Sequence, residues 1–355
     1  MVPEQSEPVP PGPLKVSVVV PVYRGAETIA GVTKAISVLR APTRTPMGRL
    51  FQVAELVLAW DHGPDASDEV LLEISAANPW VRVIWLSRNF GQHAATVAGM
   101  AATGGDWIVT MDEDGQHDPV HIGTLLDAAY ADRSQLVYAA PSNKPPHSAI
   151  RNVGSTLAKS FFLRILSGRS VVPFHSYRLI AGDAGRAVAA YSGPGVYLDV
   201  ALSWVISDVS TVRVPMRPEG RPAQSYGLRA LLSHFWRLVL SSGNRPLRIV
   251  SAAGVLCSVG GLAYAVWLVV GRMRGHPEVS GWTSLMVATL LIGGLILIAL
   301  GIIAEYVGLA ATMSMGKPSY VALDAPQRRF GPRAGTTSTV RRPSAESSRG
   351  STDPP

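Results

Sequence analysis

The chain has 355 residues, a formal net charge of +7 and 47% hydrophobic residues. That length allows one α/β domain of ordinary size together with an apolar addition. The only cysteine, Cys257, excludes an internal disulfide and a zinc site built from cysteines. Much of the basic excess lies beside apolar segments and in residues 327–349, which indicates anionic lipid headgroups and argues against a nucleic-acid ligand.

The first part of the sequence predicts a regular alternation of strands and helices. Residues 1–14 lack a basic start and an apolar core, so we expect a disordered leader and not a secretory signal. β-branched runs predict buried strands over 15–25, 53–63, 81–87 and 106–116, and helical patterns lie at 27–39, 67–77 and around 94–100. This order predicts a doubly wound α/β sheet within a catalytic domain of residues 15–225.

Polar residues follow four of these predicted strands, namely Tyr23, Asp61, Arg88 and Asp112. Ligands of such sheets bind in the crevice beyond the carboxyl ends of the strands. Any one of these residues could simply mark the point where the chain returns to solvent. Four together favour a binding site.

An acidic group ends the fourth strand. Asp112 and Asp114, two residues apart, can both reach one hard divalent cation, with Gln116 close behind and a nucleotide diphosphate filling the remaining positions. An acidic triplet alone is more often a solvated loop, so the interpretation depends on its context.

The last third of the sequence predicts a membrane hairpin. Residues 226–246 have the pattern of an amphipathic helix lying in the membrane interface, although a soluble core helix would show the same pattern. Two apolar stretches within 247–310 are each long enough to span a bilayer; the alternative is a buried hairpin in a soluble protein. The flanking basic residues predict that the domain and the tail lie on the cytoplasmic side. Residues 322–355 predict a disordered basic tail.

Several motifs resemble those of family 2 glycosyltransferases: VSVVVPVYRGAETI, LSRNFGQHAATVAGM and MDEDGQHDP. Others are similar to the polyprenyl-phosphate branch, which includes dolichyl-phosphate mannose synthases: SYRL, SSGNRPLRI, AEYVGL and GKPSYV. The resemblance implies a Rossmann-like GT-A domain followed by a two-helix transmembrane hairpin. It also implies inverting transfer of one sugar from a nucleotide sugar to polyprenyl phosphate, at the cytoplasmic face of the plasma membrane, by an enzyme whose relatives are often tetrameric.

The resemblance also implies roles for individual residues. The nucleotide would contact Pro21, Tyr23, Asp61, Arg88, Asn89 and Asp112. Mg²⁺ or Mn²⁺ would bind Asp112, Asp114 and Gln116. The acceptor phosphate would meet Lys144, Arg151, Arg178, Arg221 and Ser225. Catalysis would depend on Asp114, Arg178 and Asp199, the last as an orienting or basic group, unless it only complements a helix dipole.

One departure and two alternatives accompany this interpretation. His62 stands where the family usually has a second acid, and it is either a turn residue or a contact to the base. A processive polysaccharide synthase would be expected to show a Gln-x-x-Arg-Trp motif and more membrane spans. A non-catalytic membrane partner would be expected to have lost the acids, yet Asp112 and Asp114 are present.

Overall fold

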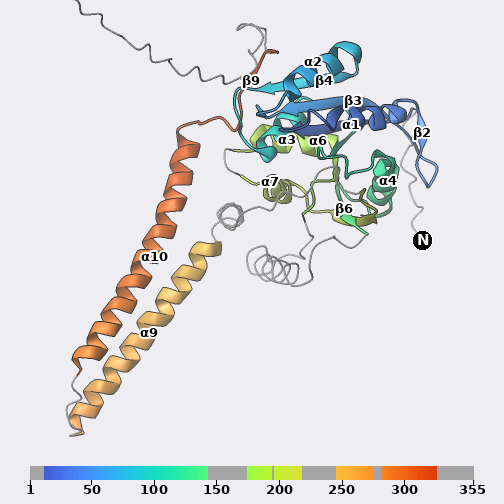
Figure 1. Ribbon diagram of the computed structural model, residues 1–355. Coiled ribbons are helices and arrows are strands. Elements are labelled where there is room, and N and C mark those ends of the chain that lie inside the picture. Colours follow the sequence, from blue (N-terminus) through green and yellow to red (C-terminus); the bar gives the residue numbers. More distant parts are fainter. Residues whose placement is uncertain (1–11, 143–173, 194–195, 218–244, 275–280, 326–355) are drawn as a thin grey trace, which may run out of the picture.

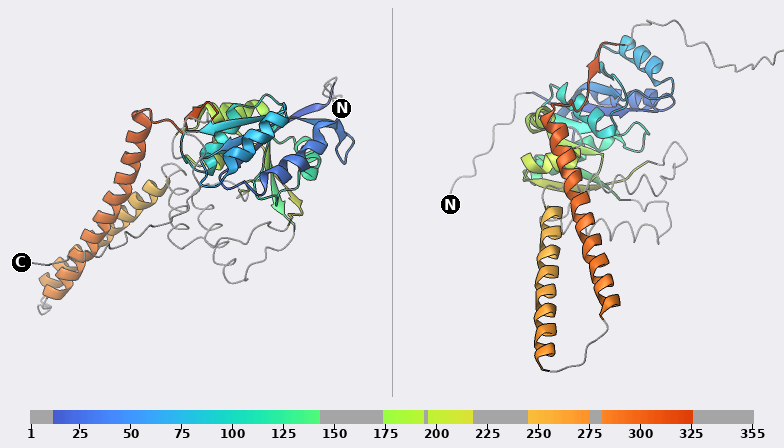
Figure 2. Two further views of the ribbon diagram at one scale, coloured as in Figure 1. Left: turned by 45° about the horizontal axis from the view of Figure 1, so that its top comes forward. Right: turned by 90° about the vertical axis from the view of Figure 1, so that its left-hand side faces the viewer.

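The computed structural model describes residues 12–142, 174–193, 196–217, 245–274 and 281–325 (Figure 1). They form an α/β domain from which a long pair of helices projects (Figure 2). The predicted amphipathic helix at 226–246 lies almost entirely outside the described residues.

One mixed sheet forms the framework of the domain. Its strands run in the order β8-β6-β7-β5-β1-β3-β4-β9, with β2 paired to β3. The bounds are β1 (Leu14–Val22), β2 (Thr43–Arg44), β3 (Leu50–Trp60), β4 (Val81–Leu86), β5 (Trp107–Thr110), β6 (Leu136–Pro141), β7 (Arg178–Ala181), β8 (Val209–Val214) and β9 (Ala322–Leu323). The four predicted strands are β1, β3, β4 and β5, and all three pairs among them are parallel. The predicted doubly wound core is therefore confirmed.

Helices cover both faces of the sheet. The bounds are α1 (Ile29–Ser37), α2 (Ser67–Ala77), α3 (Gln92–Ala101), α4 (Ile122–Ala131), α6 (Gly182–Tyr191) and α7 (Leu198–Val205), with short 3₁₀ turns η1 (Val38–Arg40) and η2 (Pro119–His121). Along β1, Val16, Val18 and Val20 pack in one cluster with residues of α1, α2 and α4. Val19 packs in another with residues of α3, α6 and α7. Burial on both faces explains why β1 is a nearly continuous run of valine.

The sheet differs from the prediction on both sides of its parallel core. β7 runs antiparallel between β5 and β6, a strand that was not predicted. It has only four residues, too few to give a periodic signal. β9 pairs antiparallel with β4 at one edge of the sheet, so the predicted start of the disordered tail at residue 322 is too early. Residues 326–355 lie outside the described part of the chain.

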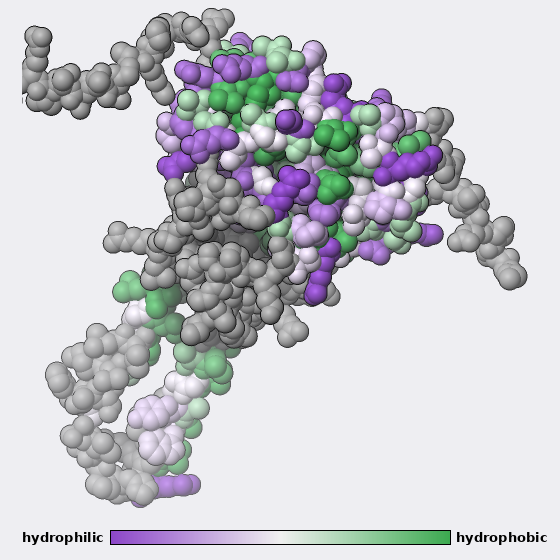
Figure 3. Space-filling model, turned by 45° about the vertical axis from the view of Figure 1, so that its right-hand side comes forward, coloured by the Kyte–Doolittle hydropathy of each residue, from purple (hydrophilic) through white to green (hydrophobic). Residues whose placement is uncertain are grey.

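The projecting hairpin consists of α9 (Arg245–Met273) and α10 (Trp282–Ser314), which have 29 and 33 residues and lie side by side (Figures 1 and 2). Many large apolar side chains on it are exposed, among them Leu256, Trp267 and Leu297 at 74%, 67% and 71%. Figure 3 shows hydrophobic residues along the coloured parts of the hairpin. Within the described part of the chain, no helix has the combination of length and hydropathy that crossing a membrane requires.

Candidate active site

Side-chain hydrogen bonds connect the loops beyond the strand ends to one another. Asp61 follows β3 and is only 3% exposed. Its two carboxylate oxygens accept hydrogen bonds from the backbone amides of Phe90 at 2.7 Å and Gly91 at 2.9 Å. Burial raises the pKa of this carboxyl, and the two amide donors partly offset the effect. Asp61 thereby fixes the loop after β4 that carries Arg88 and Asn89.

A second carboxylate fixes the loop after β1. Glu113 accepts hydrogen bonds from the backbone amides of Tyr23 at 2.9 Å and Arg24 at 3.0 Å. The loop after β3 passes close by, since a Cβ added at Gly63 would lie 1.6 Å from the carbonyl oxygen of Tyr23. Only glycine fits at this approach.

His62 lies in the turn between Asp61 and Gly63. Its φ of 53° is in the left-handed region, where histidine occurs more often than most residues. Its ring centroid lies 4.7 Å from that of Trp60. The structure therefore gives His62 the turn conformation that was one of its two predicted roles.

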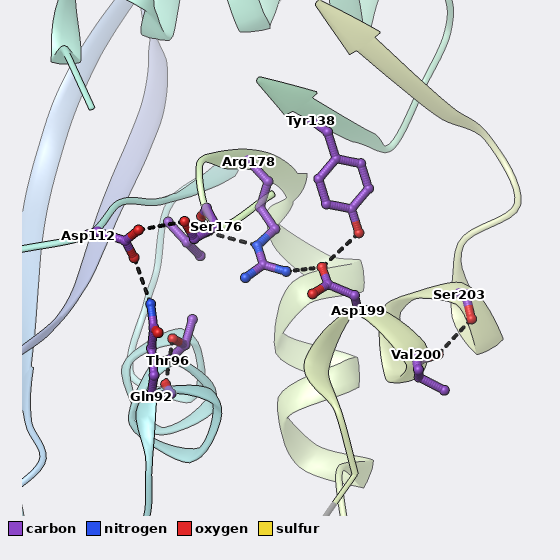
Figure 4. Close-up of polar contacts among 10 residues, drawn as sticks. Gln92, Thr96, Asp112, Tyr138, Ser176, Arg178, Asp199, Val200 and Ser203 are labelled. Atoms are coloured by element: carbon purple, nitrogen blue, oxygen red, sulfur yellow. Dashed lines mark hydrogen bonds and ion pairs between the residues drawn. The ribbon is translucent and has the colours of Figure 1, made fainter. Parts of the chain in front are cut away.

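Asp112 is held from three directions. Its carboxylate accepts hydrogen bonds from Gln92 Nε2 at 2.6 Å and from Ser176 Oγ at 2.5 Å. Its backbone amide donates to Nδ1 of the buried His117 at 3.0 Å. The carboxylate is thus linked to α3 on one side and to the start of β7 on the other (Figure 4).

Asp114 lies two residues after Asp112 in the chain, directly before a tight turn at Gly115. Gly115 has a φ of 77°, and the backbone amide of Gln116 donates to Asp114 Oδ1 at 2.9 Å. Burial raises the pKa of Asp114, and the negative charge of Asp112 raises it further. The carboxylates of Asp112 and Asp114 and the side-chain carbonyl of Gln116 offer only oxygen atoms, the type of ligand that a hard cation such as Mg²⁺ or Mn²⁺ takes.

These protein groups do not form a complete metal cage. Among the residues that the structure describes, no group of three or more His, Cys, Asp and Glu side chains could hold a metal ion. A cation bound at Asp112 and Asp114 would therefore need further oxygen ligands from a substrate or from water.

A buried ion pair lies behind Asp112. Arg178, at the start of β7, is paired with Asp199 in the first turn of α7, and both side chains are at most 5% exposed (Figure 4). Tyr138 of β6 donates to the same Asp199 oxygen at 2.8 Å, and Arg178 Nε donates to Thr110 Oγ1 at 3.0 Å. Four elements of the fold therefore fix this guanidinium.

The ion pair sets the protonation states around it. Burial disfavours the charge of Arg178, but the charge and hydrogen bond of Asp199, together with Tyr138 and Asp112, outweigh this effect, and the guanidinium pKa lies above its usual value. Burial and the charge of Asp199 together raise the pKa of Tyr138 far above its ordinary range. Tyr138 is therefore a neutral hydrogen-bond donor at physiological pH.

A pocket of about 160 Å³ connects these groups. It is lined by Gln92, His93, Thr96, Asp112, Phe174, His175, Ser176, Arg178, Tyr197 and Asp199. One predicted metal ligand and one predicted phosphate ligand thus share a single cavity.

The predicted residues divide into three sets. Asp112, Arg178 and Asp199 line the pocket, and Asp114 and Gln116 are in the adjacent turn. Others lie on the strand ends without lining it: Pro21, Tyr23, Asp61, Arg88 and Asn89. The remaining four lie outside the described residues: Lys144, Arg151, Arg221 and Ser225.

Several residues of the site were not predicted from the sequence. Gln92, Ser176 and Tyr138 hold the predicted charged groups in place. Glu113 was visible as the middle of the acidic triplet, but nothing local indicated that it binds the loop after β1. His117 directly follows the predicted metal ligand Gln116, and this position in the sequence was the only indication that it belongs to the site.

Two family profiles match the chain. "Glycosyl transferase family 2" matches residues 17–180, and "GtrB C-terminal hairpin" matches residues 245–309. Together they cover more than half of the chain. The first ends within β7, and the second covers α9 and most of α10.

Relatives and solved structures extend the comparison. The "Uncharacterized glycosyltransferase YkcC" of Bacillus subtilis is 26% identical over 312 residues, which are 87% of this chain and 93% of that protein. The "Bactoprenol glucosyl transferase" of Shigella phage SfV is 22% identical over 89% of this chain and 100% of that protein. A crystal structure of glucosyl-3-phosphoglycerate synthase from Mycobacterium tuberculosis with Mn²⁺, UDP and phosphoglyceric acid covers 65% of this chain and 78% of that chain, with 19% identity and a TM-score of 0.44.

Proposed function

The chain belongs to glycosyl transferase family 2, and from that premise we propose that it transfers one sugar from a nucleotide sugar to a polyprenyl phosphate. The product would be a lipid-linked monosaccharide with inverted anomeric configuration. The name of the phage relative, a bactoprenol glucosyl transferase, supports a polyprenyl acceptor.

One observation supports this reaction above others: Asp112 and the buried Arg178 line the same pocket. A metal-bound diphosphate on the side of Asp112 and a phosphate on the side of Arg178 would place donor and acceptor against each other. A planar guanidinium can bind a phosphate through two parallel hydrogen bonds. Its charge is retained in the buried site because Asp199 is its partner.

Asp112, Asp114 and Gln116 are the residues that would hold Mg²⁺ or Mn²⁺. When bound, the cation would neutralise negative charge on the leaving diphosphate. Gln92 and Ser176 hold the Asp112 carboxylate by both oxygens, so they orient it before substrate arrives. Preorganisation of this kind lowers the cost of reaching the productive geometry.

The acceptor needs little help from a base. A phosphate is already ionised at neutral pH, so its oxygen can bond to the anomeric carbon while the bond from that carbon to the diphosphate oxygen breaks. No proton has to be removed, and the nucleoside diphosphate leaves as an anion. Asp199 then acts as the orienting group for Arg178, which is the role that its contacts with Arg178 and Tyr138 favour.

The hairpin would place this chemistry at a membrane. Residues 249–270 carry no charged residue, and Leu285 to Leu309 carry only Glu305. The profile match at 245–309 and the exposed apolar side chains of α9 and α10 support insertion of both helices. The catalytic domain and the tail would lie on the cytoplasmic side, which is the side that basic flanking residues favour.

The test is transfer by the full-length chain in detergent. Radiolabelled UDP-glucose, UDP-galactose, UDP-N-acetylglucosamine, GDP-mannose and a dTDP-sugar would each be offered with undecaprenyl phosphate, in Mg²⁺, Mn²⁺ or EDTA. We expect one donor to give a single-sugar lipid product that EDTA abolishes. A polymeric product would instead support a processive synthase, and no product with any donor would contradict the proposal.

A further inference from the structure

We propose that residues 317–324, which follow α10 and are here called the return segment, position the nucleotide-binding loop after β4, with Tyr320 as the positioning residue. The loop comprises residues 87–91 and carries Arg88 and Asn89. The inference rests on the proposed function because it takes this loop to be part of the donor site. It adds that binding of the nucleotide depends on a segment more than 200 residues away in sequence.

The backbone of the return segment completes the sheet beside the loop. Within β9, Leu323 pairs with Trp85 and Ala322 pairs with Leu86. The backbone amide of Ser87, the first residue of the loop, donates to the carbonyl oxygen of Val321 at 2.9 Å. The loop therefore begins at a residue that the return segment holds. Figure 1 shows β9 beside β4, at the end of the chain path that comes from α10.

A side-chain contact continues this attachment into the loop. Tyr320 and Phe90 pack against the same small cluster of buried residues, which consists of Ala59, Leu86, Ala95 and Ala98. Burial raises the pKa of the Tyr320 hydroxyl, in agreement with a ring that lies partly in the protein interior. Loss of the Tyr320 ring would open the cluster on which Phe90 rests.

Phe90 in turn holds the predicted nucleotide contact. The guanidinium carbon of Arg88 lies 4.4 Å from the centroid of the Phe90 ring. The Phe90 backbone amide is bound to Asp61 at 2.7 Å. The loop is thus fixed from two sides, by Asp61, which follows β3, and by the packing that Tyr320 shares. Asp61 restrains the backbone amide of Phe90, and the shared packing restrains its ring, so loss of either support would free one of the two.

The return segment and α10 also contact the chain at the end of α6. Ser319 Oγ donates to the carbonyl oxygen of Ser192 at 2.6 Å, at the end of α6. A Cβ added at Gly193 would lie 3.5 Å from Met313 Cε in α10. The chain runs on from there to Tyr197 and Asp199, which line the pocket. The return segment is therefore attached to the domain at two places, beside β4 and at the end of α6.

The test compares three variants of the full-length chain in detergent. In Tyr320→Ala, we expect the KM for the nucleotide sugar that gives product in the transfer assay to rise on the order of tenfold, with kcat and the KM for undecaprenyl phosphate changed far less. Tyr320→Phe keeps the packing ring and should behave as wild type. Leu323→Ala is the matched control, because Leu323 belongs to the same segment but is 58% exposed.

Hydrogen exchange gives a readout that does not need activity. The amides of Phe90 and Gly91 are bonded to Asp61, so their exchange reports opening of the loop, whereas the amide of Ser87 reports pairing with Val321. We expect faster exchange at Phe90 and Gly91 in Tyr320→Ala than in Leu323→Ala. Equal rates in the two variants would overturn the inference, even if transfer were observed. Absence of transfer by wild type would contradict the proposed function and leave the exchange result to decide the role of Tyr320.

Discussion

Replacing Asp199 by asparagine would leave the Arg178 guanidinium buried beside a neutral amide. The two side chains are only 4% and 5% exposed, so water cannot take over the role of the lost carboxylate. Removing one partner of such a pair costs about 3–5 kcal/mol. Asparagine keeps an oxygen that can accept from Tyr138, which places the expected loss near the lower end, at about 3 kcal/mol. We also expect the KM for polyprenyl phosphate to rise more than that for the donor.

The assay is denaturant unfolding of the full-length chain in detergent, with Asp183→Asn as the matched control. Asp183 and Asp199 both lie in the first turn of a helix, but Asp183 is exposed and, within the described part of the chain, accepts a hydrogen bond only from the backbone amide of Ala184. If Asp199 served only the helix dipole, both variants would lose about 0.3–1 kcal/mol. Equal small losses would refute the buried-pair interpretation. A double-mutant cycle with Arg178→Gln would then measure the coupling directly.

Three further outcomes follow from the site and its loops. Asp114→Asn should abolish transfer while the protein stays folded and in the membrane fraction; undiminished turnover would refute the metal assignment. Asp61→Asn should cost about 1–2 kcal/mol, because one of two loop amides loses its acceptor, and should raise the donor KM. Because the folded-state pKa of Asp61 is raised, the stability linked to its protonation is present at low pH and lost as pH rises through that pKa. Wild type should thus gain stability relative to Asp61→Asn as pH falls toward the ordinary aspartate value, and a constant difference in unfolding free energy would contradict this. Gly63→Ala should cost more than about 2 kcal/mol, because its Cβ would meet the Tyr23 carbonyl. Gly31→Ala, where the added methyl group meets open space within α1, is the control, and thermal unfolding that fails to separate the two would count against the close approach.

The sequence predicts those parts of the molecule that are determined by residues close together in the chain. The valine run of β1 has to be buried on both faces, and the alternation with helices then leaves few sheet orders open. The four strands of the parallel core were predicted from these patterns, whereas their order in the sheet, β4-β3-β1-β5, comes from the structure. Asp112 and Asp114 could also be recognised from the local sequence. Both acids lie within three residues of each other and follow an apolar strand almost directly.

Other features depend on partners far apart in the chain. Tyr138 and Asp199 are 61 residues apart, and neither the tyrosine in a strand nor the acid in a helix turn indicates the other. The sequence left Asp199 as an orienting group, a base or a helix-dipole residue, and the contact with Arg178 favours the first of these. β9 has two residues, too short for any periodic signal, so the pairing of Leu323 with Trp85 could not be foreseen.

The place of β9 in the sheet also affects how the protein is made. β4 is complete once residue 86 has been synthesised, but its outer edge finds its partner only when Ala322 and Leu323 emerge, after both helices of the hairpin. At about 5–20 residues per second the ribosome needs on the order of tens of seconds to cover that interval. During this time the backbone groups of β4 form an open edge, the kind of surface on which unfinished chains associate. Timely delivery of the hairpin to its final location would therefore also protect the nascent domain from aggregation.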